Sequence, residues 1–223
     1  MNTRLPIIII LIVLLFALGG GYWLYQNQSS RSDSSASPKP TATVETAATT
    51  TPTTATPGRS TVTIEEFGDY QCPPCGNVHP SLKKIKAEYG DRIRFVFHHF
   101  PLTKIHANAQ PAALAAVAAG FQGRFWEMHD ELYSSQEAWS EVPDMTPHLL
   151  SLARKLNLDV TRFIADMTSP RALAVVISDQ QQGLARGVNS TPTIIINGNQ
   201  VAVENFTYEK LREQVDREIR NLK

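Results

Sequence analysis

The arrangement of apolar and polar residues divides the chain into three stretches. Residues 5–25 carry no charge and include an unbroken apolar run from Ile7 to Phe16, and this length matches the hydrocarbon core of a bilayer. Residues 26–59 consist mostly of Ser, Thr, Ala and Pro, so they cannot form a core. Residues 60–223 return to regular periodic patterns, and their length suffices for one domain with a sizeable core.

The first stretch has two interpretations. Tyr22, Trp23 and Tyr25 stand where an interfacial aromatic belt follows a transmembrane helix, whereas a cleaved signal peptide has a shorter apolar region and a small-residue cleavage site. We expect residues 1–25 to be an uncleaved, single-pass anchor, with a signal peptide as the alternative. Because Arg4 precedes the span, the rest of the chain is expected on the periplasmic or extracellular side, held by a disordered tether at 26–59.

Periodicity within residues 60–223 predicts an α/β fold with the order β-α-β, a helical insertion, and then β-β-α. Residues 61–67 alternate as a strand, and 92–100 form a second strand after a helix. A helix of this length between two strands predicts parallel pairing. Four or five helices are expected in the insertion, at about residues 103–187, with Thr146, Asp159 and Ser169 as their caps. The closing elements are expected to be strands at 193–196 and 201–203, joined by a type I′ turn, and a helix at 207–222.

Charge adds little to this picture. The 21 basic and 21 acidic residues balance, and the sequence pI is about 7.0. A nucleic-acid-binding protein normally carries a basic surface, so no nucleic-acid partner is expected.

The only two cysteines, Cys72 and Cys75, form a C-x-x-C pair at the end of the first predicted strand. Helical spacing resumes directly behind them, so the pair lies where a helix begins. Unpaired backbone N–H groups and the helix dipole favour a thiolate at this position, and the thiolate is the attacking species in disulfide exchange. We therefore expect Cys72 to be reactive and Cys75 to be able to close the ring. Pro73 fits the first helical turn.

Two other uses of the cysteines remain open at this point. A structural disulfide is possible, although so short a loop stabilises little. His79, four residues after Cys75, extends the pair to three potential ligands for copper or zinc, as in a copper-binding thioredoxin-like chaperone. The other histidines show no metal-ligand pattern, and His106 and His148 are expected on the surface without partners. We therefore predict no metal site.

Four blocks of this sequence resemble the DsbA-like thiol–disulfide oxidoreductases of the thioredoxin superfamily, including their membrane-anchored members. The blocks are Glu66-Phe67-x-Asp69-Tyr70-x-Cys72-x-x-Cys75, His99-Phe100-Pro101-Leu102, Gly123-x-Phe125-Trp126-x-Met128-His129-Asp130 and Gly187-Val188-x-Ser190-Thr191-Pro192-Thr193. The resemblance implies a thioredoxin-like fold with an all-helical insertion after the second strand. The chain departs from the family at Pro74, where strongly oxidising members carry histidine, and this leaves the direction of electron flow open.

The same resemblance implies the roles of individual residues. Cys72 matches the nucleophile, Cys75 the resolving thiol, and Pro192 the proline that the family holds in cis beside the disulfide. Glu66 matches an acidic residue beneath the active site, although strand alternation alone also allows it to face solvent. The substrate is expected to contact Thr191, Pro73 and Pro74, with the Thr191 backbone pairing with an extended segment. Asp69 and Tyr70 are expected to shape the loop.

The resemblance also implies the partners. The protein is expected to exchange disulfides with thiol-containing secreted or envelope proteins, as an oxidase or, alternatively, as a reductase or isomerase. Its recycling partner would be a quinone-linked membrane oxidase or a transmembrane reductant. We expect it to act as a monomer and to need no cofactor beyond the two cysteines.

Overall fold

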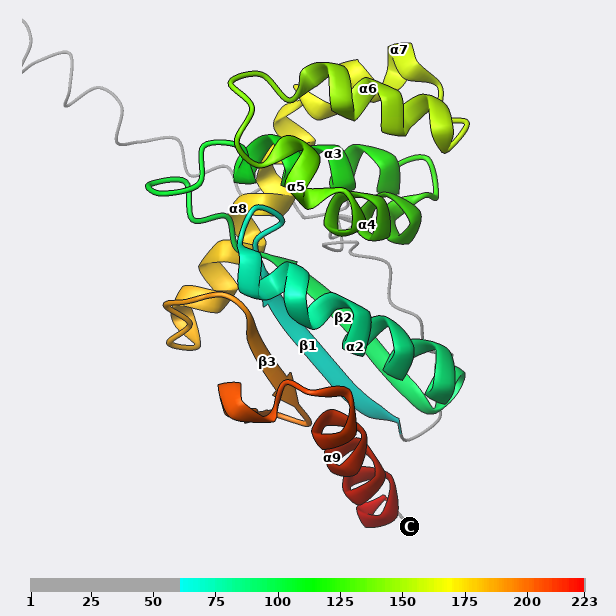
Figure 1. Cartoon of the computed structure of the whole chain (residues 1–223), viewed down its shortest axis with the longest axis vertical. Coiled ribbons are helices and arrows are strands. Elements are labelled where there is room, and N and C mark those ends of the chain that lie inside the picture. The colour runs from blue at the N-terminus through cyan, green and yellow to red at the C-terminus, as the bar shows by residue number, and fades with distance from the viewer. Residues whose placement is uncertain (1–60, 223) are drawn as a thin grey trace, which may run out of the picture. The chain divides into compact units, whose positions relative to one another are not determined.

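The computed structural model describes residues 61–222, so the predicted anchor and tether lie outside the described residues. In the described part, β1 (Val62–Gly68) pairs in parallel with β2 (Ile93–His99) and antiparallel with β3 (Thr193–Ile196). The short strand β4 (Asn199–Gln200) pairs antiparallel with β3, which gives the strand order β2-β1-β3-β4 (Figure 1). The predicted parallel crossover is therefore confirmed.

Among residues 61–222, no helix has the length and apolar character needed to cross a membrane.

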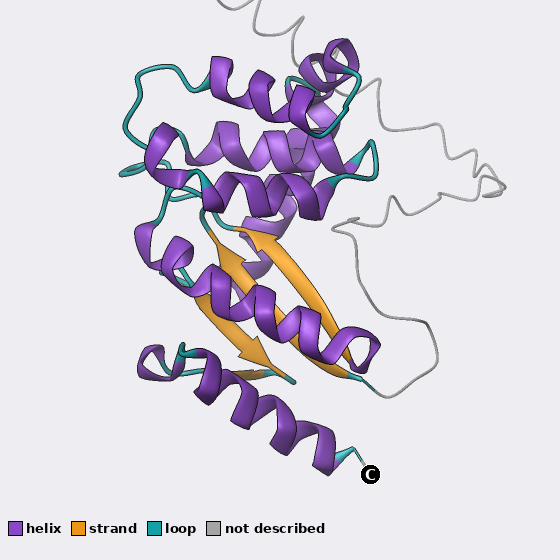
Figure 2. Cartoon of the chain, turned by 45° about the vertical axis from the view of Figure 1, so that its right-hand side comes forward, coloured by secondary structure: helices purple, strands orange, loops and turns teal. Residues whose placement is uncertain are grey.

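Helices cover both faces of the sheet. On one face, α2 (Pro73–Tyr89) and α9 (Tyr208–Asn221) pack together, and α8 (Pro170–Ala185) runs along the other face (Figures 1 and 2). The core beneath α2 and α9 contains these buried residues: Val62, Ile64, Val78, Leu82, Ile85, Tyr89, Ile93, Phe95, Ile194, Ile196, Val201, Leu211 and Val215. A smaller apolar cluster on the α8 side contains Phe67, Phe100, Val188 and Ile195. The strands therefore bury both faces.

The helical insertion stands at one end of the sheet, beyond the carboxyl end of β1 (Figure 1). It consists of α3 (Ala109–Gly120), α4 (Phe125–Ser134), α5 (Gln136–Trp139), α6 (Thr146–Lys155) and α7 (Val160–Met167), and it leads into α8. The expected insertion is confirmed, but the stretch predicted for it, residues 103–187, contains six helices when α8 is included, in place of four or five. The helix that was missed is α5, because four residues are too few to display a helical period.

Two of the three predicted helix caps are confirmed. The side chain of Asp159 accepts a hydrogen bond from the backbone N–H of Arg162, and that of Ser169 accepts one from Ala172. The third prediction was wrong, since Thr146 is already the first helical residue of α6 and its own backbone N–H donates to Asp144. Asp144, two positions earlier, therefore supplies a side-chain oxygen at the start of α6, where Thr146 was expected to supply it.

The closing turn was predicted more accurately than the strand that follows it. Asn197 and Gly198 have φ values of 47° and 84°, as a type I′ turn requires at both central positions. The strand expected at 201–203 is wrong, because β4 ends at Gln200 and the last contact with β3 is the hydrogen bond from the Val201 N–H to the Ile194 carbonyl at 2.8 Å. A short 3₁₀ turn, Val203–Asn205, then leads the chain into α9.

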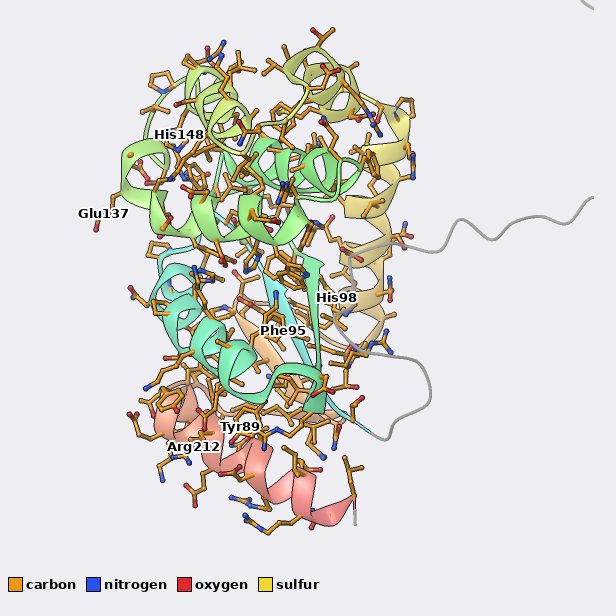
Figure 3. The ribbon with its side chains drawn as sticks, turned by 90° about the vertical axis from the view of Figure 1, so that its right-hand side faces the viewer. Tyr89, Phe95, His98, Glu137, His148 and Arg212 are labelled. Carbon is orange, nitrogen blue, oxygen red and sulfur yellow. The ribbon has the colours of Figure 1, made fainter. Side chains whose placement is uncertain are left out.

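Polar contacts fix α8 to the sheet. Arg186, just beyond the helix, forms an ion pair with Glu65 of β1 at 2.7 Å. His98 of β2, labelled in Figure 3, lies 3.1 Å from the same carboxylate. These two partners hold the pKa of Glu65 at about 2. The buried Asp179 of α8 accepts a hydrogen bond from the backbone N–H of His99 at 3.0 Å. Because the end of β2 is fixed in this way, the loop that follows it can contact Asp69 and Gln71, just before the cysteines in the chain.

Candidate active site

Both cysteines lie where β1 gives way to α2. Cys72 is the N-cap residue of α2, Cys75 lies in its first turn, and both are free thiols. The backbone N–H groups of Cys75 and Gly76 donate to the Cys72 carbonyl at 3.1 and 3.2 Å. Cys72 is 5% exposed and Cys75 is fully buried. The predicted placement at a helix start is therefore confirmed, and the two sulfurs occupy different environments.

The two thiols differ in acidity because of these environments. A hydrogen bond from the Cys75 thiol, together with the Cys75 backbone N–H, lowers the pKa of Cys72 to about 6 against the opposing effect of burial. Burial raises the pKa of Cys75 well above its ordinary value, and its hydrogen bond to Cys72 acts in the same direction. At neutral pH the reduced pair is therefore a Cys72 thiolate beside a protonated Cys75.

The loop before β3 lies against the first sulfur. The Thr191–Pro192 peptide bond is cis, as the resemblance implied, and the Cys72 thiol lies 3.4 Å from the carbonyl oxygen of Thr191. Pro73 and Pro74 are exposed beside Cys72. Four of the expected site residues thus surround the cysteine that was expected to react.

Glu66 faces the interior, which resolves the alternative that strand alternation had left open. Its side chain is fully buried, and neither carboxylate oxygen has a hydrogen-bond partner in the described part of the protein. Burial, followed by the effect of a Cys72 charge, raises the pKa of Glu66 to about 8. Glu66 in turn contributes to the raised pKa of Cys75. The site therefore contains a protonated carboxylic acid at neutral pH, electrostatically linked to both sulfurs.

The loop that carries Cys72 is shaped by Asp69, as expected. One carboxylate oxygen of Asp69 accepts a hydrogen bond from the backbone N–H of Gln71 at 2.8 Å, and the other accepts one from Leu102 at 2.9 Å. The second oxygen also lies 2.6 Å from Nδ1 of His106. The expectation that His106 has no partner was wrong, since the loop after β2 brings it back to a residue 37 positions away.

Two glutamines that the sequence analysis did not identify connect this loop to the helical insertion. Gln136 of α5 donates hydrogen bonds to the carbonyl oxygens of Tyr70 and Cys72 at 2.7 and 3.0 Å. Gln71 donates to the carbonyl of Ser140 at 2.6 Å and accepts from the backbone N–H of Asn108 at the same distance. No sequence pattern marks these residues, because each contact depends on how the insertion packs.

The remaining histidines do not join the cysteines. His79 does not meet Cys72 and Cys75 in any three-residue metal-ligand group within residues 61–222. Its ring instead stacks on Tyr133 and lies 3.4 Å from Asp130. His148 was expected to lack a partner, but its Nε2 is 2.9 Å from the Ser135 hydroxyl, and Figure 3 shows it in the insertion. The hypothetical Cys72–Cys75–His79 copper cluster is therefore not formed.

The fold and the C-x-x-C site together define a protein of the thioredoxin-like class. Residues 50–217 match the family model described as Thioredoxin, and the chain belongs to that family. The predicted family membership is confirmed.

Solved structures support the same fold. Oxidised BdbD from Bacillus subtilis matches with a TM-score of 0.65 and 23% identity, covering 76% of this chain and 92% of that one. A thioredoxin-like oxidoreductase from Silicibacter pomeroyi DSS-3 matches with a TM-score of 0.58 and 25% identity, covering 70% and 86%. For α-DsbA1 from Wolbachia pipientis the TM-score is 0.64 at 18% identity, with 76% and 91% covered. These relatives confirm the DsbA-like fold and agree with the expected oxidoreductase class.

Several curated relatives of this chain are named as Na(+)/H(+) antiporters. The chain is 38% identical over 143 residues to the Na(+)/H(+) antiporter NhaA 1 of Salinispora arenicola, and 34% identical over 145 residues to NhaA of Herminiimonas arsenicoxydans. The matches cover 64% and 65% of this chain but only 21% and 22% of those proteins. The chain thus spans about a fifth of their length, and the antiporter name describes those longer proteins.

Proposed function

We propose that this protein is a membrane-tethered, extracytoplasmic thiol–disulfide oxidoreductase that donates disulfides to thiol-containing secreted or envelope proteins. The observation that carries the proposal is the contrast between the two sulfurs, with the pKa of Cys72 lowered to about 6 and that of Cys75 raised. An acidic thiol is a good leaving group in disulfide exchange, and a thiolate stabilised in the reduced pair favours passing the disulfide on.

The reaction begins with the oxidised pair. A substrate thiolate attacks the sulfur of Cys72, a substrate–Cys72 disulfide forms, and the Cys72–Cys75 bond breaks with its electron pair on Cys75. The substrate's second thiolate then attacks the substrate sulfur of this mixed disulfide, which forms the substrate's own disulfide and releases Cys72 as a thiolate. The substrate loses two electrons and the cysteine pair gains them.

Glu66 has the properties of the proton donor in the first step. When Cys75 leaves as a thiolate inside the protein, its raised pKa requires it to take up a proton. Glu66 is buried, holds its own proton at neutral pH and has two oxygens without hydrogen-bond partners. Such a group transfers a proton without first breaking an existing contact. In the reverse direction it takes the proton back from Cys75.

The surface around Cys72 suits an extended peptide. The Thr191 backbone lies beside the sulfur, where an incoming strand would pair with it. A hollow of about 510 Å³ lies next to Pro74, and Val78, Val203 and Phe206 contribute to its lining. Substrate recognition would therefore combine backbone pairing at Thr191 with apolar contacts beside Pro74.

Location and recycling follow from the proposed anchor. A chain held by residues 5–25, with its domain outside the cytoplasm, works in an oxidising compartment. Disulfide donation then requires a membrane oxidase that takes two electrons from the reduced pair and passes them to a quinone. The alternative, a reductase or isomerase, requires a transmembrane reductant. The copper-chaperone alternative has less support, because His79 lies with Asp130 and away from the cysteines.

Mixing the oxidised protein with a reduced peptide that carries two cysteines tests this function. We expect one disulfide to pass to the peptide per protein molecule. With Cys75→Ser, a preformed mixed disulfide on Cys72 persists until a second peptide thiol resolves it, and Cys72→Ser gives no exchange. If transfer runs only from an oxidised peptide to the reduced protein, the reductase alternative holds. Exchange that survives in Cys72→Ser would contradict the proposal.

A further inference from the structure

A second cluster of chemically active side chains lies on the side of α2 that faces α4. His79 of α2 meets the neighbouring residues His129 and Asp130 of α4. Within residues 61–222, this is the one group of three such side chains whose ligand atoms all lie within 4.8 Å of one another. The thiol chemistry proposed above uses none of them.

The spacing of these atoms suits a tetrahedral metal ion. Nε2 of His79 is 3.4 Å from Oδ1 of Asp130. Two ligands that each lie about 2.0–2.1 Å from a tetrahedral Zn²⁺ are ~3.3 Å apart, so this pair is already at the right separation. The His79 and His129 rings meet edge to face, with their centroids 5.1 Å apart. The ligand atom of His129 lies within 4.8 Å of the other two and would have to move closer to complete the group.

The surroundings also match a metal site. Nδ1 of His129 is 3.1 Å from the Tyr70 hydroxyl, which leaves Nε2 for the metal and supplies the outer hydrogen bond that metal-binding histidines usually make. The cluster opens into a hollow of about 310 Å³, which Trp126 and Lys86 also line. Asp130 is about one-third exposed, so an ion can enter and a water molecule can take the fourth position.

Lys83 and Lys86 both place positive charge beside this cluster and oppose a cation there. The Nζ of Lys83 is 2.8 Å from Oδ2 of Asp130. Oδ1 is the oxygen that faces His79, so both partners use the carboxylate at once. The Lys83 side chain is 58% exposed, so it can turn into solvent at little cost. A bound dication would still be repelled by this charge. Removing the charge should therefore increase the affinity of the site for the metal ion.

We propose that His79, His129 and Asp130 form a binding site for a divalent transition metal ion, with Zn²⁺ as its simplest occupant. Two imidazoles and one carboxylate are a common set of protein ligands for zinc when a fourth position is open. The ion would join α2 to α4 one helical turn below Cys75. Through Tyr70 it would also contact the loop that carries Cys72.

Zinc titration of the full-length protein in detergent tests this site. The Cys72–Cys75 pair is first oxidised, because free thiols bind zinc themselves. Competition with a chromophoric chelator should show one Zn²⁺ per chain. Loss of a ligand should cost more than loss of an outer-shell partner, so His79→Gln and Asp130→Asn should each weaken binding by about 100-fold or more. His148→Gln, a histidine of α6 outside the cluster, is the matched control and should bind as the wild type does.

Lys83→Gln distinguishes a metal site from an anion site. Removal of the positive charge should tighten Zn²⁺ binding, whereas a pocket built for anions should lose affinity for phosphate and gain none for zinc. Saturating Zn²⁺ should raise the melting temperature of the wild type and leave that of Asp130→Asn unchanged. The proposal is overturned if no zinc binds, if His79→Gln and Asp130→Asn bind it as tightly as the wild type, or if Lys83→Gln weakens binding.

Discussion

At the scale of single residues, the site depends on charges placed in low-dielectric surroundings. Glu66 and Cys75 are both fully buried and both keep their protons, while Cys72 loses its proton more easily than a free cysteine. A buried acid disfavours its charged form, and a sulfur that receives hydrogen bonds favours it. Two thiols three positions apart in one motif therefore take opposite roles.

Glu66→Gln tests the buried acid through stability. The pKa of Glu66 is raised from 4.5 to about 8, so between these values the folded state holds one more proton than the unfolded state. The Glu66 contribution to stability is therefore present below pH 4.5 and is lost as pH rises toward 8, by about 1.4 kcal/mol per pH unit. Urea unfolding of Glu66→Gln should lack this slope, so its stability relative to the wild type should grow with pH.

A matched control makes this result specific. Glu137 is exposed on α5, as Figure 3 shows, and Glu137→Gln should follow the wild-type pH curve. Parallel curves for Glu66→Gln and the wild type would mean that Glu66 is ionised in the folded protein. Its role as proton donor to Cys75 would then be lost.

The reactive residues could be predicted from the sequence, but the residues that hold the active-site loop in place could not. Cys72 and Cys75 are the only cysteines, and their spacing at a strand–helix junction indicates the chemistry. His106 and Gln136 act through contacts with residues 37 and 64 or more positions away. Local patterns contain no information about such pairs, because the packing of the insertion creates them.

At the scale of elements, α8 lies so close to the sheet that one of its positions has no room for a side chain. A Cβ atom at Gly183 would lie 2.8 Å from ring carbons of Phe100 and 2.9 Å from Phe67. Both rings are buried, so neither can move aside freely. The absence of a side chain at Gly183 lets the helix backbone approach the sheet.

Gly183→Ala measures how much this close approach matters. Alanine favours a helix over glycine by about 1 kcal/mol, but overpacking here should reverse the sign and destabilise the protein by about 1–3 kcal/mol. Urea denaturation at constant pH gives the difference. Gln182→Ala, at the exposed position beside it, should stay within about 0.5 kcal/mol of the wild type. A stabilised Gly183→Ala would show that α8 has room to move.

Elements with strong local signals were predicted, and short elements were not. Asp159 and Ser169 cap their helices because a polar residue before an apolar period offers an oxygen to the first turn. The four residues of α5 and the two of β4 are held by neighbours and not by their own periodicity. The helix that bears Gln136 was therefore absent from the prediction, and with it one support of the active site.

At the scale of the whole molecule, the proposed membrane anchor determines where the disulfide exchange takes place. Residues 5–25 have the length and apolar character of a membrane span, and Arg4 before them favours an external domain. An external domain meets newly secreted chains whose cysteines are still reduced. The proposed function thus requires both the anchor predicted from the sequence and the site built by the fold.

Labelling in intact spheroplasts tests this location. After mild reduction, a membrane-impermeant maleimide should modify Cys72, and alkaline carbonate should leave the protein in the membrane pellet. Cys72→Ser should take up no label, since Cys75 is fully buried. Labelling that appears only after lysis would place the domain on the cytoplasmic side.

The titration of Cys72 in the reduced protein tests the central claim most directly. The rate of alkylation, followed against pH, reports the fraction of thiolate. The account predicts a midpoint near pH 6 for Cys72, as its hydrogen bonds dictate, with Cys75 unreactive over the same range. A midpoint at or above about 8.5, the value of a free cysteine, or equal reactivity of the two thiols, would contradict it.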